Sequence, residues 1–378
     1  MKNHKKLHSA ALASAAVILF LILVSSMSSA ATSQGPVKTY TYILNSGDNN
    51  VSVIDTTNNT VIATLPAVGW PYGAAVSPDG TKIYVMNFAN NTTSVIDTAN
   101  NTVIATVTVG GWPQGVAVSP DGTKVYVTNV EGTVSVIDTA TNTVTANVSL
   151  GLGPNGVAVN PAGTKAYVTN SINNTTSVID TATNTVIATV TVGGCPQGVA
   201  VNPSGTKVYV TNSLSNTTSV IDTAKNTVTA NVSVGFGPNR VAVSPDGTKV
   251  YVTNFWDYTV SVIDAASNIV TATVTMGGLP YRIVVSPDGT KVYVENQLSN
   301  TTSVIDTATN TVIATVTVES WPHGVHIKKG MDKVNIASNP DANASETNTL
   351  NNPPTTPSGF NNLIITALIV LYIWKKST

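Results

Sequence analysis

The chain has 378 residues, of which 42% are hydrophobic and only 10% are charged, and its formal net charge is -1. This composition supports a large hydrophobic core and argues against nucleic acid as a partner, because phosphate binding requires clustered Lys and Arg. The single cysteine, Cys195, excludes an intramolecular disulfide and a cysteine-based metal cluster.

The first residues combine a basic start, an apolar run from Ala10 to Val24 and small residues from Ser28 to Ala31. This order is typical of a secretory signal, so we expect residues 1–31 to be a signal peptide. The alternative is an uncleaved membrane anchor, for which the apolar run is short.

Three short phrases recur seven times in the middle of the chain, with a period of 41 or 42 residues. The tyrosine of the phrase Tyr-Val-Thr-Asn stands at Tyr42, Tyr84, Tyr126, Tyr167, Tyr209, Tyr251 and Tyr293. The aspartate of Ser-Val-Ile-Asp stands at Asp55, Asp97, Asp138, Asp180, Asp222, Asp264 and Asp306. A proline opens the third phrase at Pro71, Pro113, Pro154, Pro196, Pro238, Pro280 and Pro322.

Each repeat contains four short segments rich in Val, Thr, Ile and Tyr, with alternating side chains and no helical periodicity. Four-stranded meanders that repeat near 42 residues are typical of propeller blades. The first copy, from Lys38 to Asn45, begins at the second strand, whereas the last, from Pro322 to Ile327, holds a first strand alone. We therefore predict an all-β, seven-bladed propeller over residues 37–329, closed by pairing of the C-terminal strand with the N-terminal three.

These phrases resemble the hallmark phrases of the YVTN family of seven-bladed propellers, which are common in archaeal cell-surface proteins, including surface-layer proteins. The resemblance covers Val37 to Ile327. It implies the fold and leaves the function open, because similar propellers range from cell-surface modules to the haem d1 domain of nitrite reductases and to lactone hydrolases.

Function is expected on the face that carries the variable loops between second and third strands and the crossings between blades. We predict a ligand-binding sector there, near the mouth of the central channel, because aromatic rings stack on sugars and arginine forks bind carboxylates or phosphates. The alternative is that the tryptophans pack between blades and the arginines fill a wet channel. The candidate residues are Trp70, Trp112, Trp321, Tyr281, Arg240, Arg282 and His323.

No arrangement of residues in the repeats points to catalysis or to a metal. His323 and His326 are three apart on a strand and should point to opposite faces. The repeated aspartates are expected to cap turns, and the lysines that follow the Ser-Pro-Asp-Gly turns are expected to be solvated charges. We therefore predict no catalytic residue, no metal and no cofactor.

Asn-x-Ser/Thr sequons in the variable loops predict glycosylation in an exported protein. The alternative is chance, because the chain is rich in Asn and Thr. The predicted sites are Asn90, Asn91, Asn173, Asn174, Asn216 and Asn300.

Residues 330–359 are polar and Pro-rich, which predicts a flexible stalk. Residues 360–378 combine an apolar segment, Leu363 to Trp374, with a basic tail, and predict a membrane anchor or sorting signal. The arrangement resembles the tripartite sorting tails that archaeal surface proteins present to archaeosortases. The alternative is a buried terminal helix.

Together these features predict an extracellular, membrane-anchored cell-surface propeller. We expect it to serve as a surface-layer or adhesion module that binds a cell-surface glycan or an envelope protein and is not an enzyme. The alternative is an enzyme or redox carrier at the channel mouth, lactonase-like or haem-binding, and a third possibility is a lattice component without a ligand.

Overall fold

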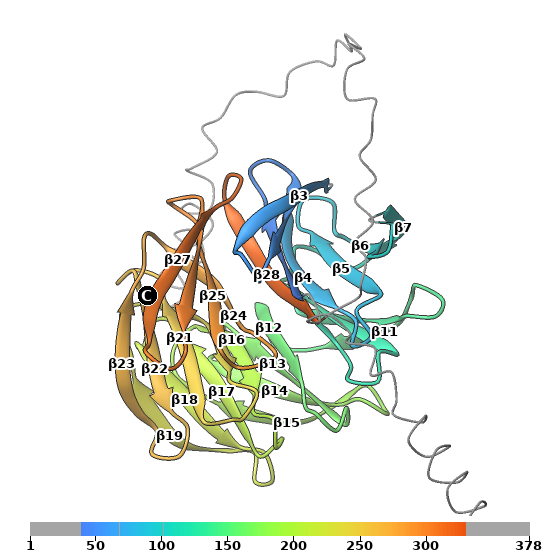
Figure 1. Ribbon diagram of the computed structural model, residues 1–378. Helices are drawn as coiled ribbons and strands as arrows, with labels where there is room; N and C mark the ends of the chain where they lie inside the picture. The colour runs from blue at the N-terminus through green and yellow to red at the C-terminus, as the bar shows by residue number, and fades with distance from the viewer. Residues whose placement is uncertain (1–38, 68, 101, 330–378) are drawn as a thin grey trace, which may run out of the picture. The chain divides into compact units, whose positions relative to one another are not determined.

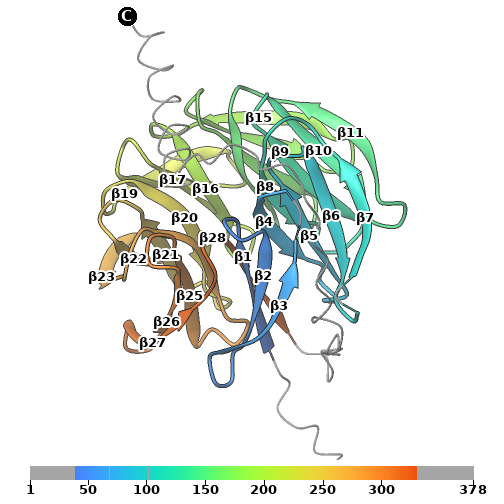
Figure 2. The same cartoon turned by 90° about the horizontal axis from the view of Figure 1, so that it is seen from above.

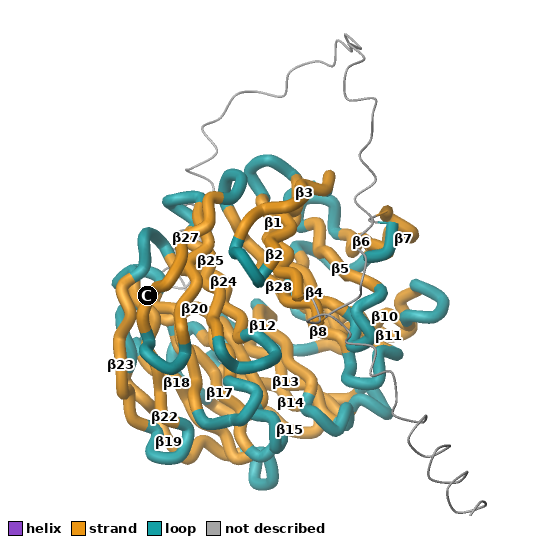
Figure 3. The backbone as a smooth tube through the Cα atoms, viewed as in Figure 1, coloured by secondary structure: helices purple, strands orange, loops and turns teal. Residues whose placement is uncertain are grey.

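The computed structural model describes residues 39–329, apart from residues 68 and 101. Within this range the chain consists of strands and connecting loops and has no helix (Figure 3). No helix of the described residues is therefore long and apolar enough to cross a membrane. The predicted signal peptide, stalk and C-terminal segment lie outside the described residues.

The described strands form seven antiparallel sheets of four strands each, which we call blades 1 to 7. Blade 1 consists of β28, β1, β2 and β3, and every other blade is built from four consecutive strands, from β4–β7 in blade 2 to β24–β27 in blade 7 (Figure 1). The predicted fold class is confirmed.

The innermost strands begin at the repeated prolines: β4 (Pro71–Val76), β8 (Pro113–Val118), β12 (Pro154–Val159), β16 (Pro196–Val201), β20 (Pro238–Val243), β24 (Pro280–Val285) and β28 (Pro322–Lys329). The second strands contain the repeated tyrosines: β1 (Thr39–Asn45), β5 (Lys82–Asn87), β9 (Lys124–Asn129), β13 (Lys165–Asn170), β17 (Lys207–Asn212), β21 (Lys249–Asn254) and β25 (Lys291–Asn296). The third strands end at the repeated aspartates: β2 (Asn50–Asp55), β6 (Thr92–Asp97), β10 (Thr133–Asp138), β14 (Thr175–Asp180), β18 (Thr217–Asp222), β22 (Thr259–Asp264) and β26 (Thr301–Asp306). The outermost strands are β3 (Thr60–Pro66), β7 (Thr102–Thr108), β11 (Thr143–Ser149), β15 (Thr185–Thr191), β19 (Thr227–Ser233), β23 (Ile269–Thr275) and β27 (Thr311–Thr317).

The ring closes where the two ends of the repeat region meet. Strand β28 pairs antiparallel with β1, so that Tyr42 lies opposite His326 and Leu44 opposite Gly324. Figure 2 shows the two strands side by side, and the innermost strands of neighbouring blades contact one another around the whole ring. The predicted closure is confirmed, and it leaves no innermost strand without a neighbour.

The hydrophobic core is divided into clusters that lie between neighbouring blades. Each repeated tyrosine is at most 1% exposed and packs against the second strand of the next blade. Between blades 3 and 4, for example, Tyr126 contacts a cluster that contains Val168 and Ile179. The cluster around Tyr293 joins blade 7 to blade 1 in the same way, so hydrophobic burial closes the ring as well.

The last two residues of the repeated phrase Tyr-Val-Thr-Asn make polar links. In blade 3, the Thr128 hydroxyl accepts from the backbone N–H of Gly115 (2.8 Å) and donates to the carbonyl oxygen of Asn155 in blade 4 (2.6 Å). The buried Asn129 amide donates to Ser135 of the third strand, at 3.0 Å. These residues of the phrase therefore each have a structural role. The tyrosine packs between blades, the threonine forms a hydrogen bond to the next blade, and the asparagine forms a hydrogen bond within its own blade.

The repeated lysines correct one expectation. They are half-buried, and the ammonium group of each donates to a backbone carbonyl in the next blade, such as that of Lys82 to Thr139 at 2.8 Å. They are therefore inter-blade bonds and not solvated charges. The aspartates cap turns as predicted: Asp138 Oδ1 accepts from the N–H of Thr141 at 2.8 Å.

Candidate functional site at the channel mouth

The second residue of each innermost strand forms a ring of seven side chains at one end of the channel. These residues are Tyr72, Gln114, Asn155, Gln197, Asn239, Tyr281 and His323. Aromatic rings occupy the consecutive blades 7, 1 and 2, and amides occupy blades 3 to 6. The mouth is therefore divided into an aromatic half and an amide half, and the aromatic half lies at the seam where the ring closes.

The three aromatic residues of the mouth contact one another. The hydroxyl oxygens of Tyr72 and Tyr281 lie 2.5 Å apart, and the ring of His323 lies 5.1 Å from each tyrosine ring. Burial, followed by the effect of Tyr281, raises the pKa of Tyr72 well above its ordinary value. Burial also lowers the pKa of His323 to about 4, so this imidazole is neutral at pH 7.

Arg282 reaches across the channel from blade 7. Its Nε donates to the carbonyl oxygen of His323 (3.0 Å), and its Nη2 lies 3.2 Å from the carbonyl oxygen of Tyr72 and 3.3 Å from that of Gln114. These acceptors belong to blades 1, 2 and 3. A Cβ at Gly73 would lie 2.5 Å from Nη2, so glycine in blade 2 makes room for the guanidinium. Burial and then the charge of Arg240 lower the pKa of Arg282 to about 10, which leaves it charged at neutral pH.

Arg240 takes the corresponding position in blade 6 and is buried. Its Nη1 donates to Asn155 Oδ1 at 3.0 Å, and its guanidinium carbon lies 5.3 Å from the centre of the Tyr281 ring. The contact with Tyr281 is a cation–π interaction. The two arginines thus have intramolecular partners and place two positive charges just below the aromatic half of the mouth.

Glu295 is a functional candidate that sequence reasoning missed. It stands in blade 7 where blades 3 to 6 carry the inter-blade threonine, and it is fully buried. Burial raises the pKa of this carboxyl well above its ordinary value, although the positive charge of Arg282 and the N–H of Gly324 act in the opposite direction. Its signal in the sequence is the change of the repeated phrase to Tyr-Val-Glu-Asn.

The three predicted tryptophans divide into two groups. Trp321 is half-buried and stacks against His323, with ring centres 6.4 Å apart and an interplanar angle of 16°. Trp70 and Trp112 are 41% and 54% exposed, and no ring contact among the described residues joins them to the mouth. All three have positive φ angles, between 53° and 56°. The structure therefore gathers Trp321, Tyr281, Arg240, Arg282 and His323, and leaves Trp70 and Trp112 on the surrounding face.

Aromatic contacts extend from the mouth along this face in both directions. Tyr72 contacts Phe88 of blade 2 at 5.4 Å between ring centres, and Tyr281 contacts Phe255 of blade 6 at 6.1 Å. Phe255 in turn contacts Trp256 at 4.8 Å. We call these five residues, together with His323, the aromatic array. Sequence reasoning did not predict this array, because the array forms across blades that are far apart in the chain.

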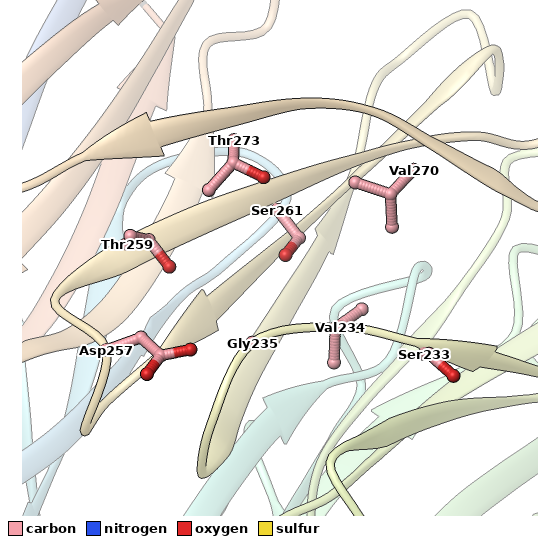
Figure 4. A pocket seen from close by; sticks show the side chains of 8 residues that line it. All are labelled: Ser233, Val234, Gly235, Asp257, Thr259, Ser261, Val270 and Thr273. Atoms are coloured by element: carbon pink, nitrogen blue, oxygen red, sulfur yellow. The ribbon is translucent and has the colours of Figure 1, made fainter.

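A pocket lies at the outer end of the array, between blades 5 and 6. Its volume is about 410 Å³, and the carboxylate of Asp257 points toward the backbone of Gly235 across it (Figure 4). The lining residues are Ser233, Val234, Gly235, Asp257, Thr259, Ser261, Val270 and Thr273.

Comparison with known proteins identifies the family. A model of the YNCE-like beta-propeller family matches residues 155–253, 199–288 and 246–343, which together cover half of the 378 residues. The chain belongs to the YNCE-like beta-propeller family. No curated protein matches this YNCE-like propeller.

Solved structures that resemble this YNCE-like propeller include hydrazine synthase of Kuenenia stuttgartiensis, with 21% identity and a TM-score of 0.63 over 68% of this chain and 95% of that one. Another is a functionally unknown protein from Desulfotomaculum acetoxidans, with 17% identity and a TM-score of 0.70 over 77% of this chain and 99% of that one. At these identities the likeness shows the fold alone.

The six asparagines predicted to carry glycans lie in the hairpin loops of the same face. Four of them, Asn91, Asn174, Asn216 and Asn300, have φ angles between 52° and 56°, and the side-chain oxygen of each accepts a bond from the N–H of a crossing residue. This turn geometry favours asparagine. It therefore gives the sequons a structural reason that sequence reasoning did not foresee, while their glycosylation stays a prediction.

The two histidines of β28 have different surroundings. Burial lowers the pKa of His326 to about 3, with a smaller effect from the charge of Arg282. His326 pairs with Tyr42 across the antiparallel strands β28 and β1. Among the described residues no group of His, Cys, Asp and Glu is arranged to hold a metal ion.

Proposed function

We propose that this propeller is an extracellular, membrane-tethered binding module that recognises a cell-envelope glycan or a surface protein through the face around the channel mouth. The observation that carries the proposal is the aromatic array, which crosses that face from blade 2 to blade 6 through the ring seam. Aromatic surfaces that are apolar on their faces and polar at their edges suit both sugars and protein partners.

Exposed side chains around the array support the same proposal. Trp70, Trp112 and Trp256 are each more than 40% exposed on this face. Large exposed aromatic residues that gather on one face mark interaction surfaces in soluble domains. The opposite face, by contrast, is built from the repeated Ser-Pro-Asp-Gly and Asp-Thr turns, which leave little chemical variety for recognition.

The cellular setting of the proposal rests on the sequence. Residues 1–31 have the order of a secretory signal, and residues 360–378 have that of a C-terminal anchor or sorting signal. A surface-layer or adhesion role, anchored in an archaeal type of envelope, follows from the resemblance of the repeated phrases to those of YVTN propellers. The sequence and the described contacts support binding better than chemistry, because the histidine at the mouth is buried and neutral and the arginines are bonded to the protein.

The proposal is tested by applying the full chain to an array of envelope-type glycans, with a double variant Trp70→Ala, Trp112→Ala. We expect binding by the wild type and a loss of roughly tenfold or more in the variant, at an unchanged melting temperature, because both side chains are exposed. The control is Leu298→Ala, at an exposed leucine of a blade 7 loop. Absence of glycan and protein binding, together with colour, bound metal or lactone turnover in the purified chain, would support the enzyme or redox alternative instead.

A further inference from the structure

The loop of blade 6 that borders this pocket departs from the turn chemistry of the other blades. Tyr258 has a φ angle of 55°, in a position that other blades fill with asparagine or, in blade 3, with Gly132. The matching asparagine of blade 5, Asn216, accepts a bond from the N–H of Gly237, which a tyrosine side chain in this position cannot reproduce. A bulky residue held at positive φ without a compensating bond is the kind of local strain that is retained at functional sites.

Exposed aromatic side chains stand next to residues of the pocket lining in the sequence. Trp256 and Tyr258, on either side of Asp257, are 41% and 42% exposed, and Phe236, next to Gly235, is 55% exposed. The ring of Trp256 lies over Gly237, where a Cβ would collide with it, so glycine in the crossing makes room for the ring. In the blade 5 hairpin the positions of Trp256, Asp257 and Tyr258 hold Leu214, Ser215 and Asn216.

The pocket is lined by four hydroxyl groups, one carboxylate and the apolar side chains of Val234 and Val270. Ser233, Thr259, Ser261 and Thr273 supply the hydroxyls, and Asp257 supplies the only charge among the lining residues (Figure 4). The Asp257 Oδ2 accepts from the N–H of Phe236 at 2.5 Å, which fixes the carboxylate and leaves Oδ1 to accept from a ligand. The volume of about 410 Å³ lies within the roughly 300–1,000 Å³ that small-molecule sites occupy.

We propose that this pocket between blades 5 and 6 binds one neutral pyranose unit of a glycan. The fixed carboxylate of Asp257 and the hydroxyls of Ser233 and Thr273 match the closely spaced hydroxyls of a sugar, whereas a peptide offers one backbone donor and one acceptor per residue. The hydroxyls of Thr259 and Ser261 already accept from the amide of Asn254. The apolar face of the sugar stacks on an exposed ring of the loop. The negative charge of Asp257 disfavours acidic sugars. This inference rests on the proposed glycan-binding function and assigns a subsite to it, at the outer end of the aromatic array.

The experiment measures binding of methyl α-mannopyranoside, methyl β-glucopyranoside and methyl β-galactopyranoside, with glucuronic acid as the charged comparator, to the full chain by saturation-transfer NMR. Three variants change the pocket: Trp256→Ala, Asp257→Asn and Tyr258→Asn. Tyr258→Asn restores the turn residue of the other blades, so it is expected to melt at or above the wild-type temperature while it loses the exposed ring. Leu214→Ala changes the exposed side chain at the position of Trp256 in blade 5 and serves as the matched control.

We expect the wild type and Leu214→Ala to bind at least one neutral glycoside and to reject glucuronic acid, and each pocket variant to bind about tenfold more weakly. Binding by Tyr258→Asn and Asp257→Asn that equals the wild type would overturn the pocket, as would a wild type that binds none of the three neutral glycosides. A glycan-array signal that survives in those cases would leave the proposed function intact, with the mouth as its site. A wild type that is silent on the array as well would overturn both the pocket and glycan recognition as the proposed function.

Discussion

The ammonium group of Lys291 donates a hydrogen bond of 2.8 Å to the carbonyl oxygen of Thr56, which lies 235 residues earlier in the chain. The bond joins blade 7 to blade 1 and repeats a contact that occurs between neighbouring blades elsewhere, such as that of Lys165 with Thr223 at 3.2 Å. The seam of the ring is therefore held by the same interactions as the interfaces between blades that are consecutive in sequence.

Replacement of this lysine tests that equivalence. We expect Lys291→Met to lower the free energy of unfolding by about 1.5–3 kcal/mol, the usual range for a hydrogen bond made by a charged group. Lys165→Met is the matched control, because it removes the same kind of bond away from the seam. Denaturant unfolding should give similar losses for the two, and a seam variant that is as stable as the wild type would contradict a closed ring.

A double-mutant cycle tests the coupling of Arg282 with the buried Glu295. Arg282→Gly and Glu295→Thr each restore the residue that the matching position holds in blades 3 to 5. Arg282→Gly alone removes three bonds to backbone carbonyls and the positive charge near a buried carboxyl, so we expect a loss of about 3–5 kcal/mol.

Addition of Glu295→Thr in that background should recover part of the loss, with a coupling free energy of about 1–2 kcal/mol in chemical denaturation. Strictly additive effects of the two substitutions would show that the guanidinium and the carboxyl do not interact.

The lowered pKa of His326 on β28 predicts a fall in stability at acidic pH. Burial lowers the pKa of His326 from 6.5 to about 3, so its contribution is fully present above pH 6.5 and is lost as the pH falls toward 3. The unfolded chain takes up the proton first, and the free energy of unfolding should fall by up to about 1.4 kcal/mol per pH unit for this group.

His326→Ala gives the strand the residue that most other blades carry at this position and should flatten the pH dependence between pH 6.5 and 4. Urea unfolding at several pH values measures the slope. An unchanged slope in the variant would show that another group causes the acid sensitivity, and His323, with its pKa lowered to about 4, is the first to examine.

The fold was predictable from the sequence because the information for it is repeated and complementary. The missing first strand at Lys38 and the spare strand at Pro322 define the closure without any knowledge of side-chain contacts. The roles of the lysines were not predictable, because the acceptors lie 57 or 58 residues further along the chain in blades 2 to 6, and 235 residues earlier for Lys291 of blade 7. Only the packing of neighbouring blades brings each lysine close to its acceptor.

The candidate site was predictable in part. Arg240 and Arg282 stood out because each replaces the glycine that other blades carry in the innermost strand. The structure brings them together with His323 at the mouth. Tyr72 and Phe255 were missed, because an aromatic residue in a variable position gains meaning only when its neighbours across the channel are known. Trp70 and Trp112 were assigned to the same sector, yet they lie on the surrounding face.

Closure of the ring by β28 is the claim on which the channel mouth depends, since Tyr281, His323 and Tyr72 meet only where blades 7, 1 and 2 adjoin. The most direct measurement compares thermal unfolding of two shortened chains, one that ends at Ser320 and lacks β28, and one that ends at Lys329 and keeps it. We predict a single cooperative transition for the longer chain and a loss of that transition for the shorter one. Equal melting curves for the two chains would contradict the closed, seven-bladed ring.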